Sequence, residues 1–205
     1  MTVSALKKTS GEHCTVVLED GSEIKSTLNT VTDLRLYSGK ELDDNALEEL
    51  KRLSARALSR QHALMLLSRR QYSKNELYKK LIEKGEDEQA AEDCVAWLAE
   101  NRLIDDEYYA GAVARHYTAK GYGAGRVKAE LARRGIDREL MAQTLETLTA
   151  SDDMIDKFIS SRLRDPGDPA EVRKISNALF RRGYSWDEIK SALRRHSAET
   201  EDCDG

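Results

Sequence analysis

The sequence predicts a mainly α-helical protein, in which tandem three-helix repeats form an elongated, curved array behind a small N-terminal β-hairpin segment. A short helical segment occurs three times at nearly even spacing. Hydrophobic residues make up 40% and charged residues 34% of the chain, which suits several thin cores under a large polar surface. The only prolines, Pro166 and Pro169, share one short loop, so proline interrupts no helix elsewhere.

The recurring segment reads SKNELYKKLIEKG at 73–85, GAGRVKAELARRG at 123–135 and EVRKISNALFRRG at 171–183. Each copy has apolar residues four positions apart, which places them on one face of a helix. Each copy also closes on a glycine that fits the left-handed position ending a helix. These glycines are Gly85, Gly135 and Gly183, and their spacings of 50 and 48 residues indicate a repeated supersecondary unit.

Residues 1–40 form the expected N-terminal segment with the β-hairpin. The stretches HCTVVLE and SEIKSTL flank Asp20-Gly21, a dipeptide suited to a tight turn, and VTDLRLY at 31–37 is expected to add a third strand. From 41 to 54 the leucines recur at helical intervals. We expect a leading helix there that braces the first repeat.

Three repeats follow at 55–102, 103–150 and 151–197, and an acidic tail occupies 198–205. Two capping boxes, Ser73 with Glu76 and Ser185 with Glu188, each predict a helix start. The expected helices span 55–70, 74–84 and 88–101, then 106–120, 124–134 and 138–149, then 152–163, 170–182 and 186–195. A unit of about 50 residues buries a marginal core, so neighbouring repeats should pack on one another.

Several classes of protein are disfavoured. The longest apolar run is too short to cross a bilayer, and the start MTVSALKKTSGEH lacks the apolar core of a secretory signal, so we expect no membrane partner and a cytoplasmic location. Cys14, Cys94 and Cys203 form neither a metal-binding spacing nor an obvious disulfide pair, and Cys94 fits a small core residue.

Catalytic patterns are weak as well. The histidines at 13, 62, 116 and 196 lie in different modules, and none has metal or nucleophile spacing with Asp, Glu or Cys. The glycine-rich run 121–125 follows a helix rather than a strand, so it predicts a turn and no nucleotide site. We therefore expect no enzyme, no cofactor and no metal.

The net charge of −4 conceals alternating blocks. Residues 60–85 carry seven Lys/Arg against two Asp/Glu, and residues 86–112 carry one against nine. Because local fields steer partners more than total charge does, the basic blocks are candidate binding surfaces.

Cations cluster on and beside the second helix of each repeat. If the repeats stack in register, these side chains form a basic track that suits a phosphate backbone or an acidic protein groove. The simpler interpretation is helix capping and solvation, because cations near a helix C-terminus complement its dipole. The candidates are Arg69, Arg70, Lys74, Lys79, Lys80, Lys84, Arg126, Lys128, Arg133, Arg134, Arg173, Lys174, Arg181 and Arg182.

Base readout by a helix-turn-helix is less well supported, since no second helix stands out as a recognition helix. Aromatic residues are only 6% of the chain, which we interpret as too few for a base-stacking platform. We expect most tyrosines to pack at core edges and both Trp97 and Trp186 to lie in the core.

The segments SRRQYSKNELYKKLIEKG, LAENRLIDDEYYA and KGYGAGRVKAELARRGI together resemble the RecX family of RecA regulators, over residues 57–148. The resemblance implies a non-catalytic, monomeric protein that binds the RecA filament on single-stranded DNA. It also implies inhibition of ATP hydrolysis, strand exchange and co-protease activity, and so a role in homologous recombination, DNA repair and the SOS response. Two alternatives remain: a single-stranded nucleic-acid binding module that acts without RecA, and a structural helical adaptor.

Overall fold

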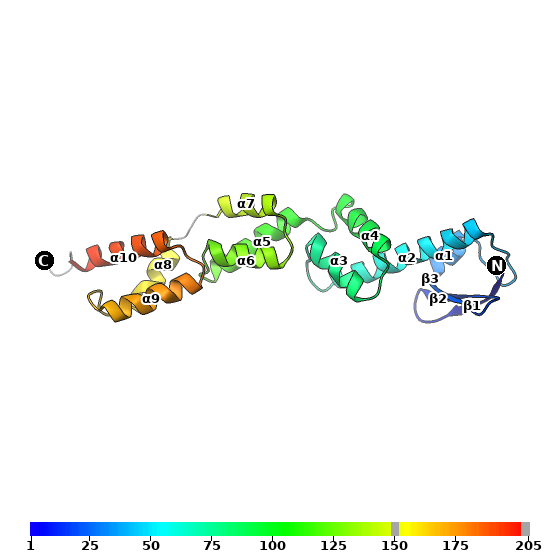
Figure 1. Cartoon of the computed structure of the whole chain (residues 1–205), viewed down its shortest axis with the longest axis horizontal. Helices are drawn as coiled ribbons and strands as arrows, with labels where there is room; N and C mark the ends of the chain where they lie inside the picture. The colour runs from blue at the N-terminus through cyan, green and yellow to red at the C-terminus, as the bar shows by residue number, and fades with distance from the viewer. Residues whose placement is uncertain (149–151, 202–205) are drawn as a thin grey trace. The chain divides into compact units, whose positions relative to one another are not determined.

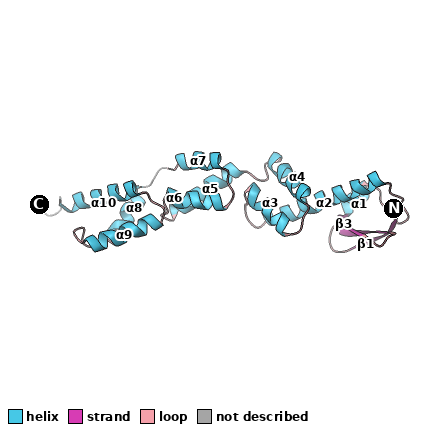
Figure 2. Ribbon diagram, viewed as in Figure 1, coloured by secondary structure: helices cyan, strands magenta, loops and turns pink. Residues whose placement is uncertain are grey.

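The computed structural model describes residues 1–148 and 152–201. Over these residues the chain forms ten helices and three strands (Figures 1 and 2), which confirms the mainly α-helical class. The chain divides into two compact units, Met1–Asp105 and Asp106–Gly205. The first unit contains the sheet and one three-helix repeat, and the second contains two further repeats.

The three strands form an antiparallel sheet in the order β1 (Val3–Lys8), β2 (His13–Leu18) and β3 (Glu23–Thr27). The predicted hairpin is confirmed: β2 pairs with β3 from His13↔Thr27 to Val17↔Glu23. In its turn, Gly21 has a φ of 84° and the Asp20 carboxylate accepts from the Ser22 backbone N–H at 2.9 Å.

The prediction of a third strand at 31–37 is wrong, because part of this stretch belongs to the short helix α1 (Leu28–Asp33). The Thr27 hydroxyl accepts a hydrogen bond from the Thr30 N–H at 3.2 Å, and this N-cap turns the chain into a helix directly after β3. The third strand is instead β1, which pairs with β2 from Val3↔Leu18.

Helix α2 (Asp44–Leu67) is continuous, whereas the sequence predicts a leading helix to residue 54 and a second helix from 55. No glycine or proline interrupts the stretch, so nothing ends the first helix. The N-terminal half packs on the sheet through Leu50, and the Ser54 hydroxyl donates to Ser26 at 2.8 Å. The C-terminal half serves as the first helix of the first repeat.

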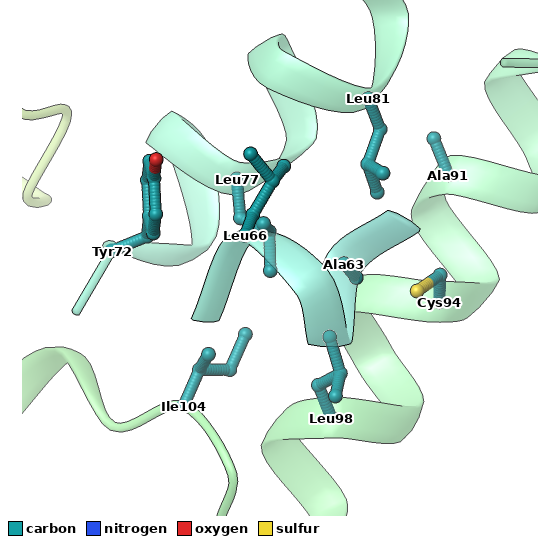
Figure 3. Packing of buried hydrophobic residues seen from close by; sticks show 9 residues of the cluster. All are labelled: Ala63, Leu66, Tyr72, Leu77, Leu81, Ala91, Cys94, Leu98 and Ile104. Carbon is teal, nitrogen blue, oxygen red and sulfur yellow. The ribbon is translucent and has the colours of Figure 1, made fainter. Parts of the chain in front are cut away.

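That repeat is completed by α3 (Lys74–Glu83) and α4 (Glu88–Glu100). The Ser73–Glu76 capping box is present at the start of α3, and Cys94 is only 1% exposed, so both predictions are confirmed. Figure 3 shows how core side chains from the three helices and from the segments that flank α3 and α4 converge. They are Ala63, Leu66, Tyr72, Leu77, Leu81, Ala91, Cys94, Leu98 and Ile104.

The second unit begins with α5 (Asp106–Ala119), α6 (Ala124–Arg133) and α7 (Arg138–Glu146), and continues with α8 (Asp152–Ser160), α9 (Pro169–Arg181) and α10 (Trp186–Glu201). Each group of three has its own core, centred on Val127 and Leu131 in one and on Ile159 and Leu179 in the other. The helix α10 runs past the predicted end at 195. The predicted repeat boundary at 150/151 and the last residues of the acidic tail lie outside the described residues.

The predicted left-handed glycines are confirmed. The φ angles are 84° at Gly85, 71° at Gly135 and 92° at Gly183, and each glycine ends the second helix of its repeat. An L-residue with a side chain is strained in this conformation. The repeated glycine therefore fixes where each second helix stops.

Candidate binding surfaces

The cations of the first repeat are exposed on and beside α3. The guanidinium of Arg70 lies 3.7 Å from the centre of the Tyr72 ring and 3.4 Å from the Glu76 carboxylate, and Lys80 pairs with Glu83 at 2.5 Å. These contacts orient two of the six side chains across the helix surface. The exposed side chains are Arg69, Arg70, Lys74, Lys79, Lys80 and Lys84.

In the second repeat the buried carboxylate of Glu130 gathers two of the candidate cations. It accepts hydrogen bonds from Arg133 at 2.6 and 3.1 Å and from Arg134 at 2.8 Å. The hydrogen bonds from Arg133 make the largest contribution and the bond from Arg134 a smaller one, and together they hold the pKa of Glu130 at about 2, well below its usual 4.5. A buried carboxylate that stays charged requires such partners.

The two arginines differ in what they offer a partner. The Arg134 guanidinium also donates to the Tyr109 hydroxyl and its side chain is only 20% exposed, so it stabilises the repeat itself. The Arg133 side chain is 67% exposed. With the exposed Arg126 and Lys128, it forms the accessible cationic surface of α6.

In the third repeat, Arg173, Lys174 and Arg181 are exposed on α9. Lys174 and Arg181 line a wide depression of about 820 Å³ between α8 and α9, together with Phe158 and Arg162. Glu171 also lines it, but this carboxylate accepts from the backbone N–H groups of Arg164 and Asp165 at 3.0 and 2.9 Å. Asp168 lines it too, and its carboxylate accepts from the Ala170 backbone N–H at 2.8 Å. Arg162, Arg164, Lys174 and Arg181 therefore outnumber the two carboxylates of the lining.

Arg182 lies at a contact between the second and third repeats. Its Nη1 donates to the Gly121 carbonyl at 3.2 Å, while its own carbonyl accepts from the Gly123 N–H at 2.9 Å. The Gly125 N–H donates to the Gly183 carbonyl, also at 2.9 Å. The guanidinium groups of Arg126 and Arg182, from different repeats, lie 5.9 and 5.6 Å from the centre of the Tyr122 ring.

This contact is a feature that the sequence interpretation missed. The run GYGAG at 121–125 predicts a turn, but its glycines also allow two backbones to approach. A Cβ on Gly123 would lie 2.5 Å from the Gly183 carbonyl oxygen. The density of glycine in this run was the available signal, since glycine often marks close backbone approach.

The expectation for the aromatic residues is confirmed only in part. Tyr72, Tyr109 and Tyr184 are buried, but Tyr108 is exposed. The expectation that Trp186 lies in the core is wrong: it is 46% exposed and stacks on Phe180. Trp186 is the first residue of α10, and helical side chains lean toward the N-terminus of their helix, so its ring lies beside Phe180 from the preceding helix.

Among the described residues, no group of His, Cys, Asp and Glu side chains could hold a metal ion. No helix in the described part of the chain is both long and apolar enough to cross a membrane.

The fold and these surfaces define a tandem three-helix repeat protein with exposed cations on the second helix of each repeat. Family models agree with this description. The model of the first three-helix domain of RecX matches residues 60–98, and that of the second matches residues 105–145.

Two similar relatives are named "Regulatory protein RecX". The one from Stenotrophomonas maltophilia (strain R551-3) is 35% identical over 137 residues, covering 65% of this chain and 84% of that protein. The one from Xanthomonas campestris pv. campestris (strain B100) is 35% identical over 138 residues, covering 65% and 85%. The chain belongs to the RecX family, as its motifs predicted.

Solved structures support the fold. A crystal structure of regulatory protein RecX has a TM-score of 0.67 at 21% identity and covers 92% of this chain and 97% of that one. The structure of RecX from Lactobacillus salivarius has a TM-score of 0.62 at 22% identity, with coverage of 69% and 96%.

Proposed function

We propose that this chain regulates the RecA recombinase by binding the RecA filament on single-stranded DNA, and that it lowers ATP hydrolysis, strand exchange and co-protease activity. It would act in the cytoplasm as a monomer without catalysis of its own, and so influence homologous recombination, DNA repair and the SOS response. The regulatory name of its RecX relatives supports a regulatory role. The repeated exposure of cations on α3, α6 and α9 is the observation that carries the proposal.

A repeated surface of this kind suits a repeated partner. Each second helix buries one apolar stripe in its own repeat, such as Leu77 and Leu81 in α3, and presents cations elsewhere on its surface. Several weak contacts to neighbouring protomers or phosphates then add through effective concentration, without any deep pocket. Contacts of this type weaken as salt rises.

Charge reversal tests this placement. The double variant R126E/K128E and the triple variant R173E/K174E/R181E change exposed side chains only, and they leave the structural Arg134 and Arg182 intact. Each should weaken binding to a RecA filament assembled on labelled single-stranded DNA by about tenfold or more, and should reduce its salt dependence.

The control is K7E/K8E/K25E, which reverses three exposed lysines of the N-terminal sheet. It should bind the filament nearly as the unchanged chain does. Unchanged filament affinity in both test variants, with helix content retained, would contradict the placement of the binding surface on α6 and α9.

A second candidate function is single-stranded nucleic-acid binding without RecA. The exposed Phe180–Trp186 pair beside the cations of α9 is the observation that favours it. Binding to bare DNA in the absence of RecA distinguishes this function from the first. A purely structural adaptor would bind neither the filament nor the bare strand.

A further inference from the structure

The basic residue before the closing glycine makes different contacts in each repeat. Lys84 is exposed at the end of α3, and Arg134 bonds to Glu130 and Tyr109 within its own repeat. Arg182 instead reaches the preceding repeat, where its Nη1 donates to the Gly121 carbonyl at 3.2 Å. Equivalent positions of the sequence therefore have different structural roles.

Two aromatic rings complete the surroundings of the Arg182 guanidinium. It lies 4.7 Å from the centre of the Phe158 ring on α8 and 5.6 Å from that of the Tyr122 ring in the turn before α6. Planar guanidinium groups stack well on aromatic faces. A carbonyl and two rings, contributed by both repeats, thus hold this side chain in place.

Backbone bonds beside Arg182 join the start of α6 to the end of α9. The Gly123 N–H donates to the Arg182 carbonyl and the Gly125 N–H donates to the Gly183 carbonyl, both at 2.9 Å. The first N–H groups and the last C=O groups of a helix have no partners inside their own helix. Here the two helix ends satisfy each other, and the positive end of the α6 dipole meets the negative end of the α9 dipole.

The two helices joined in this way both carry exposed cations. Since a short helix is stiff, a contact that fixes one end of each also sets the spacing between their surfaces. A binding element held at a fixed spacing loses little further freedom when its second surface engages, so the second contact forms at a high effective concentration. The exposed cations are Arg126, Lys128 and Arg133 on α6 and Arg173, Lys174 and Arg181 on α9.

We propose that Arg182 is a positioning residue for filament binding. It holds the second and third repeats as one rigid element, so that the cations of α6 and α9 engage the RecA filament together. This role rests on the proposed function and deepens it, because it names the residue that sets the spacing of the binding surfaces. Arg182 acts through Gly121, Tyr122 and Phe158 and makes no contact with the filament itself.

The first test is the salt dependence of filament binding. R182Q should weaken binding to a RecA filament on labelled single-stranded DNA by about 5- to 20-fold, because the second contact loses effective concentration. The slope of log affinity against log salt should stay the same, whereas an arginine paired with a phosphate would contribute about 0.7 to it. R182K keeps the charge without the planar stacking group, so it should recover only part of the affinity.

Amide hydrogen exchange reports on the contact between the repeats. Exchange of the Gly125 N–H should be faster in R182Q and in R182K than in the unchanged chain. The amides of Leu131 and Leu179, whose side chains are fully buried in their own repeats, should stay protected and show that both repeats remain folded. The matched control is R52Q on α2, where the arginine side chain is 57% exposed, and it should change neither affinity nor slope.

A double-mutant cycle separates positioning from direct contact. In the variant R173E/K174E/R181E the surface of α9 no longer binds, so its spacing from α6 has no effect on affinity. Adding R182Q to that variant should therefore change filament affinity less than about twofold, against 5- to 20-fold in the otherwise unchanged chain.

Three results would overturn the positioning role. They are an affinity of R182Q equal to that of the unchanged chain, unaltered exchange at Gly125, and a loss of equal size with and without the α9 charge reversals. A lower salt slope with full rescue by R182K would also overturn it, since Arg182 would then contact the filament directly. If the unchanged chain binds the filament and R182Q binds equally well, only the positioning role fails; if the unchanged chain does not bind, the proposed function fails as well.

Discussion

Replacing Gly123 with alanine should uncouple the second and third repeats. The new Cβ would lie 2.5 Å from the carbonyl oxygen of Gly183 and 2.6 Å from the backbone nitrogen of Tyr184. Both are backbone atoms that no rotamer change can remove, so the two repeats must separate to admit the methyl group. The backbone at Gly123 has φ −80° and ψ 172°, which alanine adopts without strain. The cost is therefore confined to the contact between repeats.

The free-energy cost of G123A follows from the hydrogen bonds that the contact between the repeats would lose. Two backbone hydrogen bonds of 2.9 Å join the repeats, and the Arg182 side chain adds one of 3.2 Å to the Gly121 carbonyl. At about 1 kcal/mol for each bond, the contact loses about 3 kcal/mol. A free energy of this size corresponds to a factor of about 100 in the equilibrium between closed and open contact.

Amide hydrogen exchange measures that equilibrium at the contact itself, because the Gly125 N–H donates to the Gly183 carbonyl. In G123A its exchange should be about 100-fold faster than in the unchanged chain. The control is G111A, inside α5, where the new Cβ meets only the flexible guanidinium of Arg115 at 3.1 Å. That change should preserve the exchange rate at Gly125 and stabilise α5 by up to about 1 kcal/mol. Unaltered protection at Gly125 in G123A would refute the reasoning.

Three other changes test separate features. E130Q should destabilise its repeat by about 1–3 kcal/mol at pH 7. The upper end of this range is set by the fall in the pKa of Glu130 from 4.5 to about 2. Since the pKa is lowered, the stabilisation is present above about pH 4.5 and is lost as the pH falls through about 2. Urea unfolding should therefore depend less on pH in E130Q between these limits, and the same dependence in both proteins would contradict the ion-pair account. Burial raises the pKa of the Cys94 thiol to about 11. Iodoacetamide should therefore label Cys94 slowly at pH 8 until urea is added. Rapid labelling of Cys94 in the native chain would count against its burial. S73A should cost about 1 kcal/mol by removing the cap of α3, and an unchanged urea midpoint would mean that the capping box contributes nothing.

The helices of the repeats could be predicted because their signals are local. A serine cap, an apolar pair four residues apart and a closing glycine act within a few residues of one another, as in Ser73, Leu77 and Gly85. Around residue 54 no cap, glycine or proline marks a helix boundary, and the structure has one continuous helix α2 where the sequence predicts two helices.

Features that depend on distant partners could not be predicted in this way. The strand β1 is defined by its pairing with β2. The partners of Glu130, Arg133 and Arg134, lie only three and four residues further along, but the burial of Glu130 depends on how its repeat packs. Local pattern identifies the candidate cations, but which of them serve the fold, such as Arg134 and Arg182, depends on tertiary contacts.

The proposed regulation of RecA is best tested by the rate of ATP hydrolysis by RecA on single-stranded DNA, titrated with this chain from well below to above one molecule per protomer. If the chain regulates RecA by binding along the filament, the rate falls progressively. A fall already complete at strongly substoichiometric amounts would indicate capping of filament ends rather than binding along the groove. An unchanged rate across the whole range, with the chain folded, would contradict the proposal that it regulates RecA.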